Sequence, residues 1–197
     1  MIKIIRQNLS RVKRFLQGNN GPYMIQGYKS LKRNVQLKRT RISNSTFIDA
    51  PSYFDIEDNV YIGHHCFIEA SHGVKIGTGC QLTNFITITS HSSHDAIRLN
   101  GANYKGGSDT IGYQTGSIEI GEYTFIGPYA TLMPGTKIGK GSIVSAYSYV
   151  TGDFPDFSII QGNPAKRIGD TRDRDKKYLK ENPQLVEHYK SWTEISE

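Results

Sequence analysis

Two histidines three residues apart, His91 and His94, are the side chains of this 197-residue chain best suited to chemistry. They lie in a polar segment that runs from Thr87 to Arg98. Imidazole, with a reference pKa of about 6.5, accepts a proton at neutral pH, so a histidine here predicts a general base. A zinc site needs at least three converging ligands, which two neighbouring histidines do not supply. Metal ligation would therefore need a third histidine from elsewhere.

A period of six residues runs through the chain and must position this segment. An amphipathic helix would repeat about every 3.6 residues and a half-exposed strand every two, so neither fits. The spacing predicts an all-β solenoid, a triangular parallel β-helix in which three six-residue units make one coil and each coil is stabilised by its neighbours. The inward aliphatic positions are Ile56, Ile62, Ile68, Ile76, Leu82, Ile88, Ile120, Ile126, Leu132, Ile138, Val144 and Val150, and Ile42 and Ile48 fit at the start.

Small residues two positions before the aliphatic ones are also expected to point inward, near corners that leave little room. They include Thr124, Ala130, Thr136, Ser142 and Ser148. Cys66 and Cys80 occupy the same position before Ile68 and Leu82. We therefore expect both cysteines to be buried packing residues, and their spacing predicts neither a disulfide framework nor a zinc finger.

The period divides the chain into three parts. Residues 1–41 are expected to be a basic N-terminal helix and connector, and residues 42–169 the β-helix. A polar, glycine-rich loop interrupts the β-helix at 91–117. Residues 170–197 are highly charged and are expected to be a helical tail. Because loops inserted into repeat proteins cluster on the binding face, the loop at 91–117 points to the functional site.

The positive charge is concentrated at the N-terminus. Eleven basic residues and no acidic one precede Asp49, whereas the rest of the chain has 13 basic and 18 acidic residues. Residues 1–17 could lie on an anionic membrane surface or form a solvated helix that caps the β-helix. Nucleic-acid binding is not predicted, because stacking and recognition motifs are missing. No signal peptide or membrane-spanning stretch is visible, so a soluble, cytoplasmic protein is expected, with peripheral membrane contact as an option.

The histidine segment and the end of the period carry a family resemblance. An H-x-x-H motif after a repeat strand, a looping insertion and later I-G-x-x-x-x-I-G repeats resemble the hexapeptide-repeat acetyltransferases, which include the galactoside, maltose and xenobiotic acetyltransferases. Residues Gly162–Arg167 read G-N-P-A-K-R, which is similar to the G-x-P-A-[KR] exit of that family. The resemblance covers about residues 42–170 and is strongest to the sugar and polysaccharide O-acetyltransferases.

This resemblance implies a left-handed β-helix, a homotrimer, and acetyl-CoA bound between neighbouring subunits, with His91 as general base. No serine or cysteine lies in a persuasive nucleophile setting, so direct transfer to a sugar hydroxyl in a ternary complex is favoured. Gly152 stands where relatives often carry lysine, which puts one phosphate contact in doubt. The residues that the resemblance assigns to the acyl donor are Phe125, Ala146, Thr151, Lys166 and Arg167.

An orienting group for His91 follows from the register. Ile68 and Ile88 lie one coil apart. Glu69 should therefore stack below Thr89, close to His91, where it would orient the imidazole or contact substrate. A backbone carbonyl or an acid from the next subunit are alternative orienting groups, and a solvated corner is the alternative role of Glu69.

Asn84 and His94 are the other expected substrate contacts, and His94 could instead tie down the loop.

Several functions remain open beside sugar O-acetylation in surface polysaccharide assembly. N-acetylation of an amino nucleotide sugar needs the same fold and base. A metal hydrase like the γ-class carbonic anhydrases needs three converging histidines, and a non-enzymatic ice-binding solenoid needs a regular threonine ladder, which this chain lacks.

Overall fold

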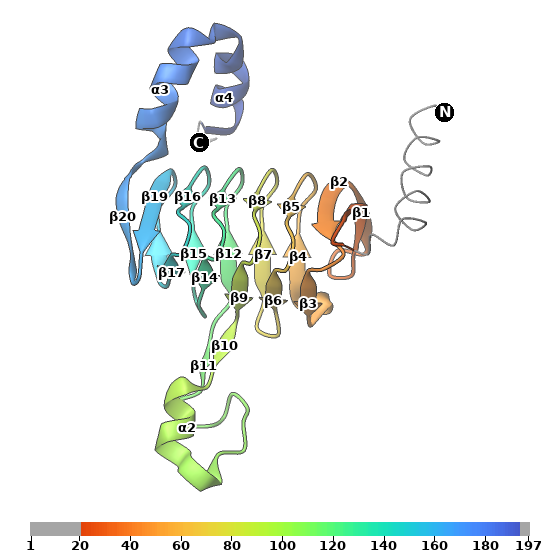
Figure 1. Ribbon diagram of the computed structural model, residues 1–197, viewed down its shortest axis with the longest axis vertical. Coiled ribbons are helices and arrows are strands. Elements are labelled where there is room, and N and C mark those ends of the chain that lie inside the picture. Colours follow the sequence, from red (N-terminus) through yellow and green to blue (C-terminus); the bar gives the residue numbers. More distant parts are fainter. Residues whose placement is uncertain (1–20, 194–197) are drawn as a thin grey trace.

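The computed structural model describes residues 21–193, and the body of the molecule consists of short strands in three sheets (Figure 1). The chain visits sheets A, B and C in turn and then returns to sheet A, so three consecutive strands make one coil. Equivalent strands of successive coils pair in parallel, as Ile68 does with Ile88 and Ile88 with Leu132. Stacked coils, each supporting the next, are the expected outcome of a six-residue period.

The strands of each sheet are as follows, in chain order. Sheet A contains β1 (Met24–Ser30), β2 (Val35–Ser43), β5 (Tyr61–Ile62), β8 (Gln81–Leu82), β13 (Phe125–Ile126), β16 (Ile143–Val144), β19 (Ser158–Gly162) and β20 (Ala165–Asp170). Sheet B contains β3 (Phe47–Asp49), β6 (Phe67–Glu69), β9 (Thr87–Thr89), β14 (Thr131–Leu132) and β17 (Tyr149–Val150). Sheet C contains β4 (Phe54–Ile56), β7 (Val74–Ile76), β12 (Ile118–Ile120), β15 (Lys137–Ile138) and β18 (Asp153–Phe154).

The inward side chains confirm the six-residue prediction. Every aliphatic position from Ile56 to Val150 is buried, and Ile48 alone of the two early positions is only partly buried. The five predicted small residues are buried as well, as are Cys66 and Cys80, which are free thiols. Burial raises the pKa of the Cys80 thiol to about 12, so this cysteine is an inert packing residue.

Close stacking of the coils explains the glycines that follow the aliphatic residues. A Cβ atom on Gly121 would lie 2.4 Å from the backbone nitrogen of Lys140 in the next coil. No side chain fits there without moving the backbone. Glycine is therefore required by the distance between coils at this position.

Every lengthening of the six-residue spacing falls on one corner of the structure, between sheets B and C. The chain takes eight residues from Ile48 to Ile56 and again from Ile68 to Ile76, instead of six. It takes 32 residues from Ile88 to Ile120. The first lengthening contains η1 (Pro51–Tyr53), and the third forms the long loop that projects from the body in Figure 1. The B–C corner is therefore where extra backbone gathers.

The long loop is partly structured. Strand β10 (His91–Ser92) pairs antiparallel with β11 (Gln114–Thr115), and between them lie α2 (His94–Asn100) and η2 (Gly101–Asn103). The corner between sheets A and B is different. His65, Phe85, Tyr129 and Tyr147 all have φ near +60° there, and their rings stack in sequence along the corner.

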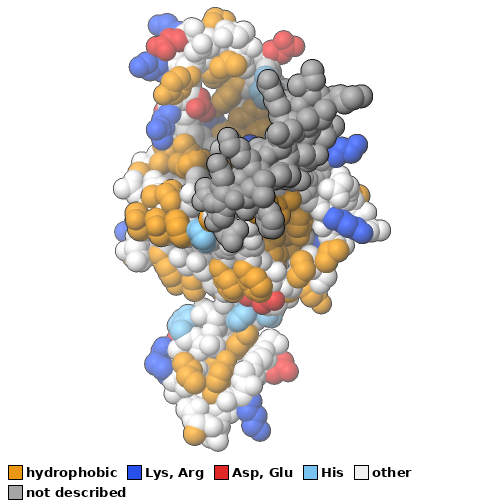
Figure 2. Space-filling view, turned by 45° about the vertical axis from the view of Figure 1, so that its right-hand side comes forward, with side chains coloured by type: hydrophobic (Ala, Val, Ile, Leu, Met, Phe, Trp, Pro, Cys, Tyr) orange, Lys and Arg blue, Asp and Glu red, His pale blue; other side chains and the backbone are white. Residues whose placement is uncertain are grey.

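The two ends of the described chain flank the coils. The connector expected before residue 42 is largely a hairpin of β1 and β2. After β20, the chain forms α3 (Thr171–Glu181), η3 (Pro183–Leu185) and α4 (Val186–Thr193). Charged side chains are prominent on these helices, and hydrophobic ones come to the surface on the body (Figure 2). No helix within residues 21–193 is long and apolar enough to cross a membrane. The helix expected at 1–17, with its proposed membrane contact, lies outside the described residues.

Leu132→Ala is expected to lower the free energy of unfolding by about 2–5 kcal/mol, because it leaves a cavity in a fully buried stack. Leu132 pairs with Ile88 on one side and Val150 on the other. Urea unfolding at one fixed protein concentration measures the change. The control is Thr131→Ala on the same strand, whose partly exposed side chain faces outward. A Leu132 variant as stable as the control would contradict the packing described here.

Candidate active site

The B–C corner places His91 beside residues from the preceding coil. His91 begins β10, where its pairing with Thr115 closes the base of the long loop. The Thr89 hydroxyl also donates to the His91 carbonyl at 2.7 Å. Glu69, one coil earlier, lies next to Thr89 in the strand register, as the sequence predicted. The histidine is therefore held at its backbone by the loop and by sheet B together.

The imidazole contacts the Glu69 carboxylate directly. His91 Nδ1 lies 2.8 Å from Glu69 Oε2, and the Ser71 hydroxyl oxygen lies 3.4 Å from the same nitrogen. The Glu69 side chain is 5% exposed and that of His91 is 35% exposed. The carboxylate is thus buried behind the histidine, while part of the ring remains open to a ligand.

Backbone and hydroxyl donors fix the Glu69 carboxylate. Glu69 Oε1 accepts from the Ser71 backbone N–H at 2.7 Å, and Oε2 accepts from the Ser90 backbone N–H and hydroxyl, both at 2.9 Å. Burial alone would raise the pKa of Glu69, but these hydrogen bonds outweigh it and lower the pKa to about 2. Glu69 is therefore ionised at neutral pH and can only accept hydrogen bonds.

An acceptor-only carboxylate determines the tautomer of the neutral histidine. His91 Nδ1 must carry the proton that is donated to Glu69, which leaves the lone pair on Nε2. The carboxylate also stabilises the imidazolium that forms when Nε2 takes a proton. The pair has the arrangement expected of a general base and its orienting acid.

Two more rings surround His91. Tyr113 stacks on it with a centroid distance of 5.5 Å and an interplanar angle of 9°, and His72 meets it edge-on at 5.9 Å. Tyr113 comes from the returning end of the long loop, next to β11. Burial, with smaller contributions from Tyr104 and the Glu69 carboxylate, raises the pKa of Tyr113, so its ring stays neutral. A neutral aromatic face stabilises a cation held over it.

Tyr113→Leu is expected to lower kcat by about 3–10-fold with little change in KM, because the stack acts on the imidazolium and not on a substrate. Tyr113→Phe keeps the ring face and should retain activity within about twofold. Steady-state kinetics of both variants provide the measurement. Equal losses in the two variants would mean that the hydroxyl matters and the stack does not.

The structure separates the other expected substrate contacts. His94 Nδ1 lies 2.7 Å from the Ser92 hydroxyl, and its Nε2 lies 3.4 Å from both Asp95 and Gln114, so its contacts tie the loop together. The Asn84 side chain accepts from the His64 backbone N–H at 2.8 Å, at the A–B corner. Within the described part of the chain, neither residue forms a hydrogen bond or ion pair with His91.

The five residues expected to contact the acyl donor are also distributed around the coils. Phe125 lies on the outer face of sheet A, 39% exposed, and Lys166 and Arg167 lie on β20 of the same sheet. Arg167 pairs with Asp170 at 3.0 Å. Ala146 is exposed at the A–B corner, and Thr151 is exposed just after sheet B. Residues 21–193 of one chain therefore do not unite them with His91 in a single pocket.

Metal ligation finds no support within one copy. No group of three histidine, cysteine, aspartate or glutamate side chains in residues 21–193 could hold a metal ion. A three-ligand centre of the kind considered from the sequence would need a ligand from outside residues 21–193 of one copy.

Comparisons with known families match the repeated segments. The protein-family model for "Bacterial transferase hexapeptide (six repeats)" matches residues 117–152. The family model for "Hexapeptide repeat of succinyl-transferase" matches residues 55–90. The first match follows the long loop, and the second ends at Ser90, beside His91.

Curated relatives match over more of the chain. Galactoside O-acetyltransferase of Escherichia coli is 29% identical over 145 residues, which cover 70% of this chain and 66% of the relative. The putative lipopolysaccharide biosynthesis O-acetyl transferase WbbJ of the same species is 30% identical over 56% of this chain and 57% of its own length. The chain thus spans less than two thirds of either relative.

A solved structure supports the fold alone. AntD, an N-acyltransferase from Bacillus cereus in complex with dTDP and 3-hydroxybutyryl-CoA, superposes with a TM-score of 0.54 at 17% identity. The superposition covers 73% of this chain and 88% of that one.

Proposed function

Because two segments of the chain match models of hexapeptide-repeat transferases, we propose that the chain belongs to that family and is an acetyl-CoA-dependent O-acetyltransferase that acetylates a sugar hydroxyl in surface polysaccharide assembly. The observation that carries the proposal is the buried Glu69 carboxylate 2.8 Å from His91 Nδ1. The proposal includes a left-handed β-helix and a homotrimer. The acetyltransferase names of the two curated relatives support it.

In the proposed reaction, His91 Nε2 takes the proton of the acceptor hydroxyl as its oxygen attacks the thioester carbonyl. A bond forms between that oxygen and the acetyl carbon, the carbon–sulfur bond breaks, and the leaving sulfur takes the proton from His91. Glu69 holds the ring in the Nδ1–H tautomer and stabilises the imidazolium. General-base catalysis of this kind contributes about 10²–10⁴-fold.

The proposal places the acyl donor between two copies of the chain. Phe125, Lys166 and Arg167 lie on sheet A, whereas His91 lies at the B–C corner. Side chains on different sides of one β-helix can take part in one reaction if sheet A of a neighbouring copy lies against the B–C corner of the first. Lys166 and Arg167 would supply the cations that the phosphates of CoA require. Asn84 and His94 remain proposed acceptor contacts in such an assembly.

The test is acetyl transfer from acetyl-CoA to a panel of sugars and nucleotide-linked amino sugars, with the products identified. An alkali-labile ester that accumulates at a rate dependent on His91 supports O-acetylation. An amide product would instead indicate N-acetylation of an amino sugar, which needs the same base. If no acceptor is acetylated and CoA does not bind, the proposal fails.

Mixing two inactive variants is expected to restore activity if the site is shared. His91→Ala and the double variant Lys166→Gln, Arg167→Gln would each be tested alone, then unfolded together and refolded as a mixture. Mixed assemblies contain some sites with one intact face from each copy, so activity should exceed the sum of the separate samples. A mixture no more active than its parts, although mass spectrometry shows mixed assemblies, would mean that one copy supplies the whole site.

A further inference from the structure

A cavity of about 430 Å³ opens beside His91 on the outer face of sheet C. Ser71 and His72 form part of its wall, and both contact the His91 ring. Tyr53 in η1 and Ser117, where the long loop returns to the coil, also line it. All three lengthened B–C corners therefore contribute to this cavity.

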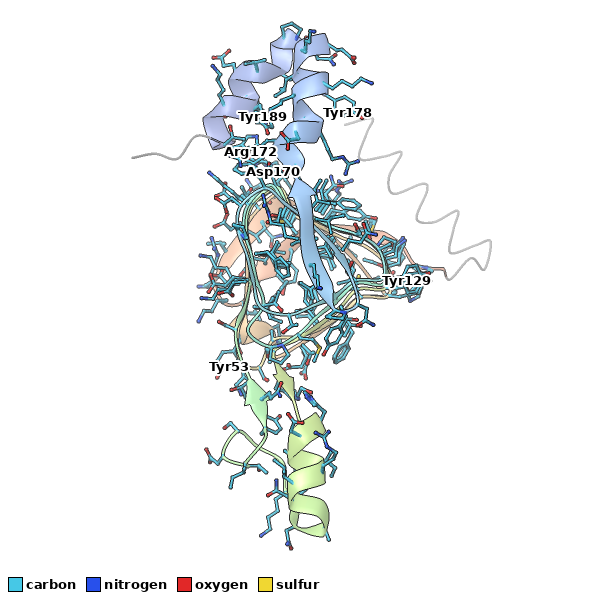
Figure 3. The ribbon with its side chains drawn as sticks, turned by 90° about the vertical axis from the view of Figure 1, so that its left-hand side faces the viewer. Tyr53, Tyr129, Asp170, Arg172, Tyr178 and Tyr189 are labelled. Atoms are coloured by element: carbon cyan, nitrogen blue, oxygen red, sulfur yellow. The ribbon has the colours of Figure 1, made fainter. Side chains whose placement is uncertain are left out.

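Extra backbone at three successive corners surrounds this cavity. The lengthened corners also place larger buried side chains, Phe54, Val74 and Ile118, where the regular spacing has a small residue such as Thr136. In Figure 3, Tyr53 lies near the base of the projecting loop, whereas Tyr129 lies on another side of the coils. The corner that holds the base also holds the cavity, so the cavity is where an acceptor would reach Nε2.

The lining is polar with one open aromatic ring. Asp55, Lys75 and Glu119 lie side by side on adjacent strands of sheet C, and Tyr53 is 55% exposed. Neither Lys75 nor Glu119 forms an ion pair or side-chain hydrogen bond within the described residues, while Asp55 pairs with Arg33. Adjacent strands are roughly 4.8 Å apart, so ammonium and carboxylate groups alternate at that spacing. Sugar hydroxyls both donate and accept, which suits such an alternation.

The cavity continues along sheet C. A second cavity of about 460 Å³ shares Lys75 and Glu119 with the first and extends past Lys137 to Phe154. Lys137 pairs in register with Glu119 and with Asp153, so the alternation of charge continues through two further strands. Together the cavities form one groove that leads away from His91 over several coils. A groove of this length fits a chain of sugars better than a single ring.

The charge of the groove opposes a nucleotide-linked acceptor. Four lysines and five carboxylates line the two cavities together. A diphosphate requires an excess of cations or a row of backbone N–H groups at a helix end, and the groove residues supply no such excess. An uncharged glycan has no such requirement.

From these observations, and resting on the proposed acetyl transfer, we propose that the groove along sheet C binds an uncharged oligosaccharide acceptor, with Tyr53 and Lys75 next to His91 and Lys137 farther along. The stacked rings of Phe85, Tyr129 and Tyr147 lie at the A–B corner, on another side of the coils, while Tyr53 is an exposed aromatic ring in the groove itself.

The test uses glucose, galactose and N-acetylglucosamine as acceptors, each as the free sugar, as oligomers of two to four residues and as the uridine-diphosphate derivative. We expect KM to fall as the oligomer lengthens and to be highest for the derivative. Tyr53→Ala should raise KM about tenfold for all oligomers with kcat nearly unchanged, as expected for the loss of one aromatic contact. Lys137→Gln should raise KM only for the longer oligomers, and Lys180→Gln on α3 is the matched control.

Three outcomes would overturn the proposal that the groove binds an oligosaccharide acceptor. One is a nucleotide-linked sugar with the lowest KM, and another is His91-dependent acetylation that Tyr53→Ala and Lys137→Gln leave unchanged. The third is loss of assembly, measured by light scattering, when Lys75→Glu is introduced, which would make the groove a contact between copies. If no acceptor is acetylated, the proposed function fails and the groove assignment falls with it.

Discussion

His91→Ala is expected to lower kcat by about 10²–10⁴-fold, the range that a positioned general base contributes. The His91 ring contacts the buried carboxylate, and it also contacts Ser71 and His72, which line the cavity of about 430 Å³. Because Nδ1 keeps its proton and donates a hydrogen bond to Glu69, Nε2 is the basic atom, and alanine removes it without replacement. The measurement is single-turnover acetyl transfer at saturating acetyl-CoA.

His72→Ala is the matched control for this variant. His72 lies at the same corner, its ring centroid is 5.9 Å from that of His91, and it is exposed, but within residues 21–193 its side chain forms no hydrogen bond or ion pair with Glu69. The kcat of the control should stay within about tenfold of the wild-type value, because His72 lines the cavity but does not accept the proton of the acceptor hydroxyl. A His91 variant that matches His72→Ala, with both proteins folded, would remove His91 from the mechanism.

The coils could be predicted from the sequence because the period of six is a backbone property. Ile62, Ile88 and Leu132 fall on the inward side wherever the period holds, since each strand and corner consume six residues. The small inward residues follow for the same reason, as Thr136 and Ser148 show. The same register predicts that Glu69 lies beside Thr89, close to His91, and the strand pairing of Glu69 with Thr89 confirms this position.

The parts of the site that break the period could not be predicted in the same way. Tyr113 reaches His91 from the returning end of a loop that follows no repeat, so no spacing relates the two. Tyr53 belongs to a lengthening of two residues near the start of the series, where Ile48 is only partly buried and the period is weakest. The lengthened spacing itself was the available signal. That the three insertions surround one site becomes clear only from the fold, which places all of them at the B–C corner.

The expected acyl-donor residues follow from the family resemblance and not from the six-residue register. Phe125 and His91 lie on different sides of the coils, so their relation depends on how two copies meet. The repeat period predicts the fold of one chain, but it does not predict how two copies are oriented relative to each other. Asn84 illustrates the same limit, because within its own chain its side chain binds the His64 N–H.

Glu69→Gln is expected to lower kcat by about 10²–10⁴-fold, although it changes one atom, because an orienting carboxylate of this kind determines the tautomer of its histidine. Both carboxylate oxygens accept from backbone N–H groups, of Ser71 and of Ser90. A glutamine must therefore direct its NH₂ at one of these donors. If the NH₂ takes the Oε2 position, it also donates to His91 Nδ1, which moves the ring proton to Nε2 and removes the base.

The same variant should change how stability depends on pH. The folded-state pKa of Glu69, about 2, lies below the ordinary value of 4.5. Its contribution is therefore complete above about pH 4.5 and is lost as the pH falls toward 2. Glu69→Gln should be less stable than the wild type at pH 7, and the difference should shrink on acidification through that window. Glu181→Gln, an exposed carboxylate on α3, is the control and should show neither effect. A Glu69 variant that loses stability but keeps kcat would make the carboxylate a structural group only.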